Sequence, residues 1–191
     1  MAKRMMHVSL CPGEVGGYVL MPGSPERAVR LSAYLENAQQ MAYFREYQTF
    51  TGLLEGERVS ITSTGMGGPS MAIAVEELHE CGAHTMIRVG TCQSTSPKVH
   101  KGDLVLPNGA VRMEGVANHY APLEYPAVPD MDVLAALEAA ARARGKRYHV
   151  GVTATKACFS TQFAAAGRPM GYELTKRWEA YEAGGALSAD M

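Results

Sequence analysis

The sequence predicts a layered α/β/α fold with a mixed central sheet, formed by one domain that spans residues 1–191. Short apolar runs ending in glycine or proline alternate with longer segments of helical spacing, which is the pattern of strands connected by helices. Hydrophobic residues make up 47% of the 191 residues and charged residues 19%, as expected for a soluble globular protein with a sizeable core. We find no internal repeat or linker that would divide the chain.

The first strand and helix are predicted at residues 17–22 and 25–35. The strand is a short apolar run that ends in the breakers Pro-Gly-Ser-Pro. The helix has apolar residues at helical spacing, with Ser24 as its cap and Pro25 in its first turn, both typical of a helix start.

The later elements follow from the same two patterns. Apolar runs that end at glycine or threonine indicate strands, and amphipathic segments that end at glycine indicate helices. The strands are predicted at residues 58–64, 84–91, 102–111 and 149–155, and the helices at residues 69–82, 131–145 and 171–185.

Charge and cysteine usage limit the classes of partner. The formal net charge is -1, and Lys and Arg are scattered along the chain, so we expect neither a nucleic-acid nor a membrane surface. A small anionic ligand needs only a few local arginines. The four cysteines are far apart without a C-x-x-C pair, which favours reduced thiols in a cytoplasmic protein. We see no signal peptide and no apolar stretch long enough to span a bilayer.

The turn after the first strand is a candidate anion site. Gly23 permits a close backbone approach, and the start of a helix presents N–H groups that favour anions. Arg27 lies one turn into the helix and is placed to close over the same anion. The alternative, a capped helix with a solvated arginine, is the commoner structure.

Arg88 strengthens the case for an anion. It interrupts an otherwise apolar predicted strand, so we expect it to be buried and to need an anionic partner, for which phosphate fits the guanidinium well. Gly90 and Thr91 follow with a close backbone approach and a hydroxyl. An internal salt bridge, for example to Asp103, is the alternative. Arg45 lies in a strand-like alternating stretch and by itself is expected to be a surface arginine on a hairpin.

Other catalytic motifs are missing from the sequence. The glycine-rich segment at residues 65–70 lacks the Lys-Ser/Thr ending of a Walker loop and is not G-x-G-x-x-G. The histidines lack metal-ligand spacing, and there is no G-x-S-x-G motif. A hydrolytic nucleophile is therefore not expected.

Taken together, these stretches resemble the nucleoside phosphorylase-I family. The matching segments are MPGSPERA, FREYQTF, STGMGGPSMAIAVEEL, RVGT, NHYAPLEYPAVPD and GVTATKACF. They occur in family order and cover nearly the whole chain. The segment HYAPLEYPAVPD resembles the uridine branch of the family rather than the purine branch.

The resemblance implies a reaction. Inorganic phosphate, the co-substrate, attacks the anomeric carbon of a pyrimidine nucleoside and gives ribose 1-phosphate and free base, without an organic cofactor. Arg88, Thr91 and Arg27 are the expected catalytic residues, and they bind phosphate together with Gly23. Arg45 matches an arginine supplied by a neighbouring subunit, as expected for homodimer units that assemble into a hexamer.

The resemblance also implies a nucleoside site and a cation site. His7 matches a residue that crosses the subunit interface to the ribose 5′-hydroxyl, whereas the other matching positions contact sugar or base. A second group matches positions that hold a monovalent cation, expected to be potassium, between subunits. The nucleoside positions are His7, Phe159, Gln162 and Met191, and the cation positions are Glu46, Met66 and Ser70.

Three departures from the family pattern bear on specificity and completeness. Gln93 stands close after RVGT, where a glycine is usual, and Ala164 stands where the uridine branch often has an arginine; Arg168 is a substitute only if its loop folds back. The chain stops at Met191, inside a motif that continues with glutamate in the family, so we expect the domain to be incomplete at its C-terminus. A protein ending there is expected to be at best a poor catalyst.

Three rival functions remain open. A purine nucleoside phosphorylase and a hydrolytic nucleosidase share the expected fold, although a nucleosidase does not need three phosphate-binding arginines. A non-catalytic nucleoside-binding protein is the third, if the chain truly ends at residue 191.

Overall fold

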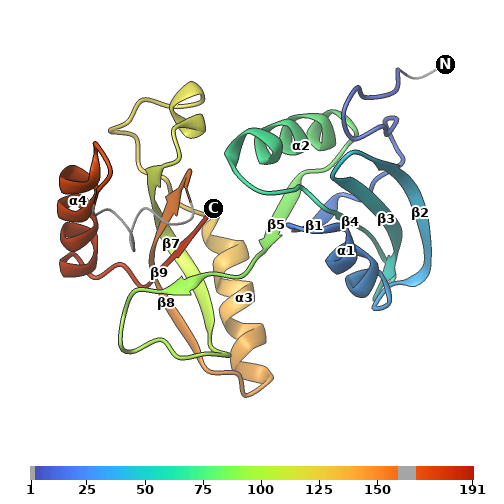
Figure 1. Ribbon diagram of the computed structural model, residues 1–191. Coiled ribbons are helices and arrows are strands. Elements are labelled where there is room, and N and C mark those ends of the chain that lie inside the picture. The colour runs from blue at the N-terminus through green and yellow to red at the C-terminus, as the bar shows by residue number, and fades with distance from the viewer. Residues whose placement is uncertain (1–2, 159–166) are drawn as a thin grey trace. The chain divides into compact units, whose positions relative to one another are not determined.

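The computed structural model describes residues 3–158 and 167–191 and divides the chain into two compact units, Met1–Gly90 and Thr91–Met191. Each unit holds a mixed β-sheet with helices (Figure 1). The predicted α/β class with mixed sheets is thus confirmed. In the described part of the chain, no helix is both long and apolar enough to cross a membrane.

The first unit is built on a five-stranded sheet in the order β2-β3-β4-β1-β5. β1 runs parallel to both β4 and β5, whereas β3 runs antiparallel to β2 and β4. The carboxyl ends of β1, β4 and β5 therefore lie at one edge of this sheet. The strands are β1 (Tyr18–Pro22), β2 (Glu36–Phe44), β3 (Tyr47–Leu54), β4 (Glu57–Thr62) and β5 (Thr85–Val89).

Helices cover both faces of this sheet, so the unit is a three-layer α/β/α structure (Figure 1). Because side chains alternate along a strand, β1 contributes Leu20 to one face and Val19 and Met21 to the other. Helix α1 (Pro25–Ser32) packs on the Leu20 face and α2 (Gly68–Glu80) on the opposite face.

The predicted elements of the first unit differ from the structure at α1, β2 and β3. The helix predicted at residues 25–35 ends at Ser32, because Leu35 instead leads into β2 while its side chain stays buried in the cluster beside α1. β3 was not among the predicted strands, although the stretch around Arg45 was interpreted as strand-like and as part of a hairpin. Most of β2 was not predicted as a strand either. It is the edge strand, and its mostly exposed residues lack the apolar run expected of a buried strand.

The second unit holds a four-stranded sheet in the order β6-β9-β8-β7. β7, β8 and β9 are parallel neighbours, and β6 pairs antiparallel with β9. At the carboxyl ends of these strands, Met113 of β7 pairs with Lys156 of β8, and Asp190 of β9 pairs with Thr155, the residue before Lys156. The strands are β6 (Gln93–Ser94), β7 (Leu104–Met113), β8 (Tyr148–Lys156) and β9 (Ser188–Asp190).

Two helices lie on opposite sides of this second sheet (Figure 1). The alanine-rich α3 (Met131–Ala143) contacts β7 and β8, and α4 (Gly171–Ala183) packs Trp178 against Ala154 and Ala189. Both helices begin at the predicted residues and end two residues earlier than predicted.

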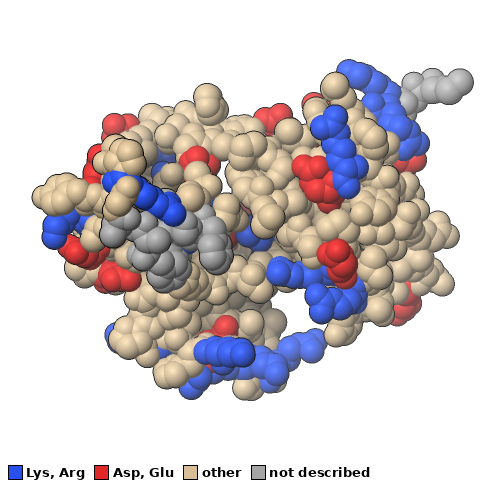
Figure 2. All heavy atoms as spheres, viewed as in Figure 1, with Lys and Arg blue, Asp and Glu red and all other residues tan. Residues whose placement is uncertain are grey.

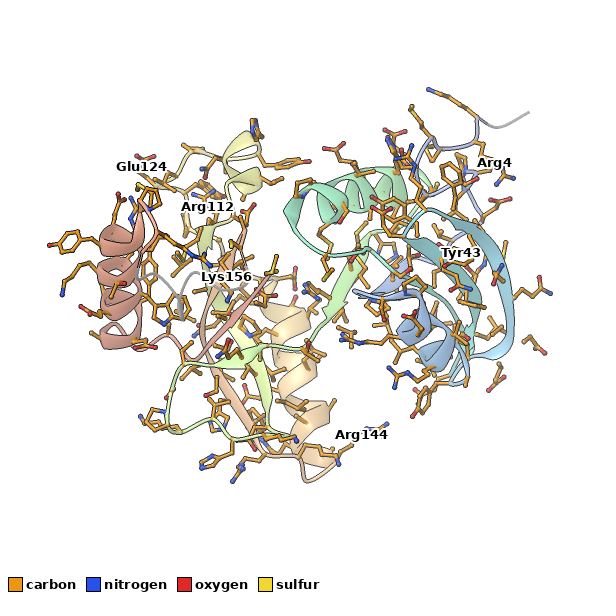
Figure 3. All side chains as sticks on the ribbon, in the orientation of Figure 1. Arg4, Tyr43, Arg112, Glu124, Arg144 and Lys156 are labelled. Carbon is orange, nitrogen blue, oxygen red and sulfur yellow. The ribbon has the colours of Figure 1, made fainter. Side chains whose placement is uncertain are left out.

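The loop between β7 and α3 is held from inside by one arginine. Arg112, on β7, donates hydrogen bonds to the carbonyl oxygens of Ala121, Pro122, Leu123 and Tyr125. Figure 3 shows Arg112 at the base of this loop. A short 3-10 helix (Val116–His119) lies within the same loop.

The charges are mixed on the face shown in Figure 2, where basic and acidic side chains are interspersed. This distribution accords with the formal net charge of -1.

Candidate functional site

The carboxyl edge of the first sheet brings three connecting segments together. In the parallel pairing of β1 with β5, Met21 lies opposite Arg88 and Pro22 opposite Val89. The backbone N–H of Thr64, after β4, donates to the carbonyl of Pro22 at 3.0 Å. The segments that follow β1, β4 and β5 are therefore neighbours, which is where ligands bind in sheets of this kind.

The β1–α1 turn has the predicted cap. Ser24 accepts a hydrogen bond from the Arg27 N–H through its side chain at 3.4 Å and through its carbonyl at 3.1 Å. Glu26 occupies the same first turn, and its own backbone N–H, followed by the Ser24 hydroxyl, lowers the pKa of its carboxyl. The first helical amides are thus engaged by Ser24 and Glu26, so an anion at this turn has to rely mainly on the segment before the helix and on the Arg27 side chain.

Gly23 lies against the segment that follows β4. A Cβ at Gly23 would stand 3.5 Å from the carbonyl oxygen of Gly65, an ordinary van der Waals distance. Gly23 and Gly65 thus bring two backbones close together at the sheet edge, which leaves this part of the edge lined by main chain.

Arg88 is exposed, and the expectation that it would be buried is wrong. It is the next-to-last residue of β5 and therefore lies near the carboxyl end of the sheet. A Cβ at Gly90 would lie 2.4 Å from Nη1 of Arg88 and 2.9 Å from its Cζ. The guanidinium therefore occupies the space that the missing side chain of Gly90 leaves open.

Asp103, considered above as a partner of Arg88, has other partners. Its carboxylate accepts hydrogen bonds from the backbone N–H of His100 at 2.9 Å, from Nε2 of His149 at 2.9 Å and from Nε of Arg147. The His100 N–H is the largest cause of a strongly lowered Asp103 pKa, and the His149 and Arg147 side chains lower it further against the opposing effect of burial.

Arg45 lies in the tight turn of the β2–β3 hairpin, as its sequence pattern indicated. Phe44 pairs with Tyr47 across the hairpin, so Arg45 and Glu46 form the turn itself, with Arg45 at a φ of 55°. The guanidinium lies over the Phe44 ring, 5.4 Å from its centroid. Arg45 is exposed and points its charge away from the core.

The three predicted cation positions converge around Gly65. A Cβ at Gly65 would stand 2.9 Å from Cγ of Glu46 and 3.4 Å from the Ser70 hydroxyl. That hydroxyl donates to the carbonyl oxygen of Met66 at 3.4 Å. A carboxylate, a hydroxyl and a carbonyl are oxygen donors of the type that hard cations accept. Among the described residues, no group of three or more His, Cys, Asp or Glu side chains is placed to hold a metal ion.

A buried tyrosine supports this cluster. The Tyr47 hydroxyl donates to the carbonyl oxygen of Ser70 at 3.0 Å. Burial, and then the negative charges of Glu46 and Glu77, raise the pKa of Tyr47 to about 12, so the phenol stays protonated and keeps donating.

His7 is held by Glu77, a residue that the sequence analysis missed. Nδ1 of His7 lies 2.7 Å from Oε1 of Glu77, and the backbone N–H groups of His7 and Val8 donate to the same carboxylate. Glu77 follows the buried Ala74 by three residues and precedes the buried Leu78, so it lies next to the inward face of α2, whereas Glu76 is exposed. That position on the helix was the available sequence clue.

The remaining predicted residues lie in the second unit or outside the described residues. Thr91 is the first residue of the second unit and is exposed. Met191 follows β9, beside Asp190, which accepts a hydrogen bond from the Thr155 hydroxyl at 2.9 Å. Phe159 and Gln162, and with them Ala164, lie outside the described residues.

Two further polar residues lie near the carboxyl edge of the second sheet. Gln93 pairs with Ala189 of β9, so this departure from the family pattern is built into the sheet beside the strand that leads to Met191. Lys156, at the end of β8 (Figure 3), is only 3% exposed. Its burial lowers the pKa of its amine, and the nearby Cys158 and Asp190 act in the opposite direction. Lys156 was not predicted as a site residue, because its burial depends on the tertiary structure.

A family model and several known proteins that are similar to this chain all point to phosphorylases. The family model described as phosphorylase superfamily matches residues 18–186. The chain is 47% identical over 163 residues to a uridine phosphorylase of Thermococcus kodakarensis, covering 85% of this chain and 58% of that protein. It is 42% identical to a uridine phosphorylase of Treponema pallidum, covering 97% and 72% of the two chains. A guanosine phosphorylase of Halorubrum lacusprofundi is 39% identical, covering 76% and 60%. The chain thus spans about three fifths of the length of the first of these relatives (58%).

Proposed function

Because this chain belongs to the phosphorylase superfamily, we propose that it catalyses the reversible phosphorolysis of a pyrimidine nucleoside, converting uridine and phosphate to uracil and ribose 1-phosphate. The observation that carries the proposal is the register of β1 and β5, which sets Arg88 at the same sheet edge as the turn that holds Gly23 and Arg27. The similarity to proteins named uridine phosphorylase supports uridine as the substrate.

Phosphate binding is assigned to the arginines at that edge. A phosphate dianion fits the planar donors of Arg27 and Arg88, with Gly23 allowing close approach of the main chain. Thr91 adds a hydroxyl in this proposal. An oxygen of the held phosphate forms the new bond to the anomeric carbon while the bond to the base nitrogen breaks, and the base leaves with that electron pair and takes up a proton. Positioning and charge stabilisation supply the catalysis, without a side-chain nucleophile.

The nucleoside is assigned to four residues that match family positions. In this proposal, His7 reaches across the subunit interface to the ribose 5′-hydroxyl in the neighbouring subunit's site, and Met191 lies under the ribose. Phe159 packs on the sugar and base, and Gln162 hydrogen-bonds the pyrimidine edge. The family match crosses both units without interruption, which supports treating residues 1–191 as parts of one nucleoside phosphorylase domain.

The site is proposed to be shared between subunits of a homodimer, with dimers assembling into a hexamer. The exposed position of Arg45 at a hairpin turn suits a residue that reaches a neighbouring subunit. Mixing Arg45→Ala subunits with Arg88→Ala subunits tests this arrangement, because half of the mixed sites regain both arginines. Activity that stays at the level of the separate variants after verified subunit exchange contradicts a shared site.

A monovalent cation, potassium, is proposed at Glu46, Met66 and Ser70. The Ser70 hydroxyl and the Met66 carbonyl, with the Glu46 side chain close by, suit a hard cation of low charge. The ion would neutralise the Glu46 carboxylate and stiffen the segment after β4. We also infer a cytoplasmic location, since the buried Cys81 and the exposed Cys92 are free thiols in the structure.

A purine nucleoside is the second candidate substrate. The similarity to a guanosine phosphorylase favours it, and so does Ala164, which stands where the uridine branch often has an arginine.

Initial rates of base release from uridine, thymidine, inosine and guanosine, each with and without phosphate, decide among the candidates on protein of verified intact mass. Phosphate-dependent release of uracil supports the proposal, and phosphate-dependent release of a purine alone supports the second candidate. Release without phosphate indicates a nucleosidase. Binding of nucleoside without any release indicates a non-catalytic protein.

A further inference from the structure

The Glu77 carboxylate collects three donors from one short segment of the chain. Nδ1 of His7 lies 2.7 Å from Oε1, the His7 N–H donates at 3.0 and 3.1 Å, and the Val8 N–H donates at 2.7 Å. Both the main chain and the ring of His7 are thus bound by one group on α2.

The segment around His7 is itself firmly seated. Val8 and Leu10 are fully buried in the core beside α2, and the Met5 N–H donates to the carbonyl of Leu10 at 2.7 Å. The His7 side chain is 29% exposed and that of Glu77 is 14% exposed. The ring therefore has its Nδ1 side on the protein and part of its surface open to a ligand.

The charge on Glu77 determines which ring nitrogen carries the hydrogen. Although burial acts to raise the pKa of Glu77, the hydrogen bonds from the Val8 N–H, the His7 ring and the His7 N–H lower it below its ordinary value. An ionised carboxylate only accepts hydrogen bonds, so Nδ1 must donate. In a neutral imidazole, Nε2 then carries the lone pair.

We propose that Glu77 is a positioning residue that fixes His7 in the Nδ1–H tautomer and presents Nε2 as the acceptor for the ribose 5′-hydroxyl of the nucleoside. This inference rests on the proposed function for the identity of the ligand, whereas the tautomer follows from the contacts of Glu77 alone. The residue acts through His7 and does not itself touch the substrate.

Substitution of Glu77 by glutamine reverses the role of the ring. The amide keeps one oxygen for the backbone N–H groups of His7 and Val8, and its NH₂ group donates to Nδ1. The ring then carries its hydrogen on Nε2 and loses the acceptor for a hydroxyl. Glu80→Gln, on the same helix and exposed, removes the same charge without a contact to His7 and is the matched control.

The ¹⁵N chemical shifts of the His7 ring test the tautomer directly, at a pH about two units above the ordinary histidine pKa. His7→Gln assigns the resonances by their loss. We expect a protonated Nδ1 and an unprotonated Nε2 in the unaltered protein and in Glu80→Gln, and the reverse in Glu77→Gln. A protonated Nε2 in the unaltered protein overturns the proposal, whatever the enzyme activity.

The ratio of kcat/KM for uridine to that for 5′-deoxyuridine tests the role of Nε2. One hydrogen bond of ordinary strength corresponds to a ratio of about ten. We expect this ratio in the unaltered protein and in Glu80→Gln, and a fall to about one or two in Glu77→Gln and His7→Gln, mainly through KM for uridine. An unchanged ratio in Glu77→Gln overturns the positioning role. Absence of uracil release from the unaltered protein refutes the proposed function instead, and the ¹⁵N measurement still decides the tautomer.

Discussion

The carboxyl edges of the two sheets carry positive charge in different ways. At the first sheet, Arg88 is exposed and lies over a glycine, beside a turn that is lined by main chain. At the second sheet, Lys156 is almost fully buried, with Cys158 and Asp190 nearby. A small anion reaches the first charge from water, whereas the second is already enclosed by the protein. The difference teaches that accessibility, more than charge alone, favours the edge of the first sheet as the proposed phosphate site.

Replacement of Arg88 by alanine is the strongest test of this contrast. Loss of a donor that stabilises transition-state charge costs about a hundredfold or more in rate, so we expect kcat/KM for phosphate to fall by about that factor. Nucleoside affinity, measured separately by titration, should change about threefold at most. Arg30→Ala, which removes an exposed arginine from the last turn of α1, is the control. An equal loss of phosphate and nucleoside use would remove Arg88 from the phosphate site.

Replacement of Gly90 by alanine tests whether the position of the Arg88 guanidinium matters for phosphate binding. The added methyl would stand 2.4 Å from Nη1 of Arg88, so the flexible guanidinium must move while the backbone stays as it is. We expect KM for phosphate to rise about tenfold, the effect of one weakened charged hydrogen bond, with little change in thermal stability. In an Arg88→Ala background the same substitution should have no effect on KM. A full effect in that background would mean that Gly90 acts independently of Arg88.

The residues at the two sheet edges and the residues that support them were predicted from the sequence with unequal success. The Gly23–Arg27 turn was predictable because strand, cap and proline are adjacent in the sequence, so local rules define its geometry. Arg88 was correctly placed in a strand but wrongly expected to be buried. It lies one residue before the end of β5, and the sequence did not show where that strand ends. Glu77 and Lys156 were missed, since their contacts join segments far apart in the chain.

Substitution of Asp103, which precedes β7, tests whether the amino end of the second sheet contributes to stability and not to phosphate binding. Its lowered pKa means that the ionised form stabilises the fold above the ordinary aspartate pKa of about 3.9, and that this contribution is lost as the pH falls below that value. We expect Asp103→Asn to lower the urea midpoint at neutral pH, and the difference from the unaltered protein to shrink in acid. A constant difference across this pH range would contradict the assigned charge, and a changed KM for phosphate would contradict the separation of roles.

The smallest expected effect is at Ser24, which we assign to capping. Loss of the side-chain cap in Ser24→Ala should destabilise the protein by about 0.5–1 kcal/mol. This value is toward the lower end for caps, because the hydrogen bond that the Ser24 hydroxyl accepts from the Arg27 N–H is long at 3.4 Å. Chemical denaturation measures this change, and Ser24→Asp should restore the stability. A large rise in KM for phosphate in Ser24→Ala would show that the serine contributes to the anion site.

Calorimetric titration of the protein with inorganic phosphate, without nucleoside, tests the central claim most directly. We predict saturable binding of one phosphate per site that is abolished in Arg88→Ala, weakened in Arg27→Ala and unchanged in Arg30→Ala. Phosphate binding of equal affinity in Arg88→Ala and the unaltered protein would contradict the assignment of the site to the carboxyl edge of the first sheet.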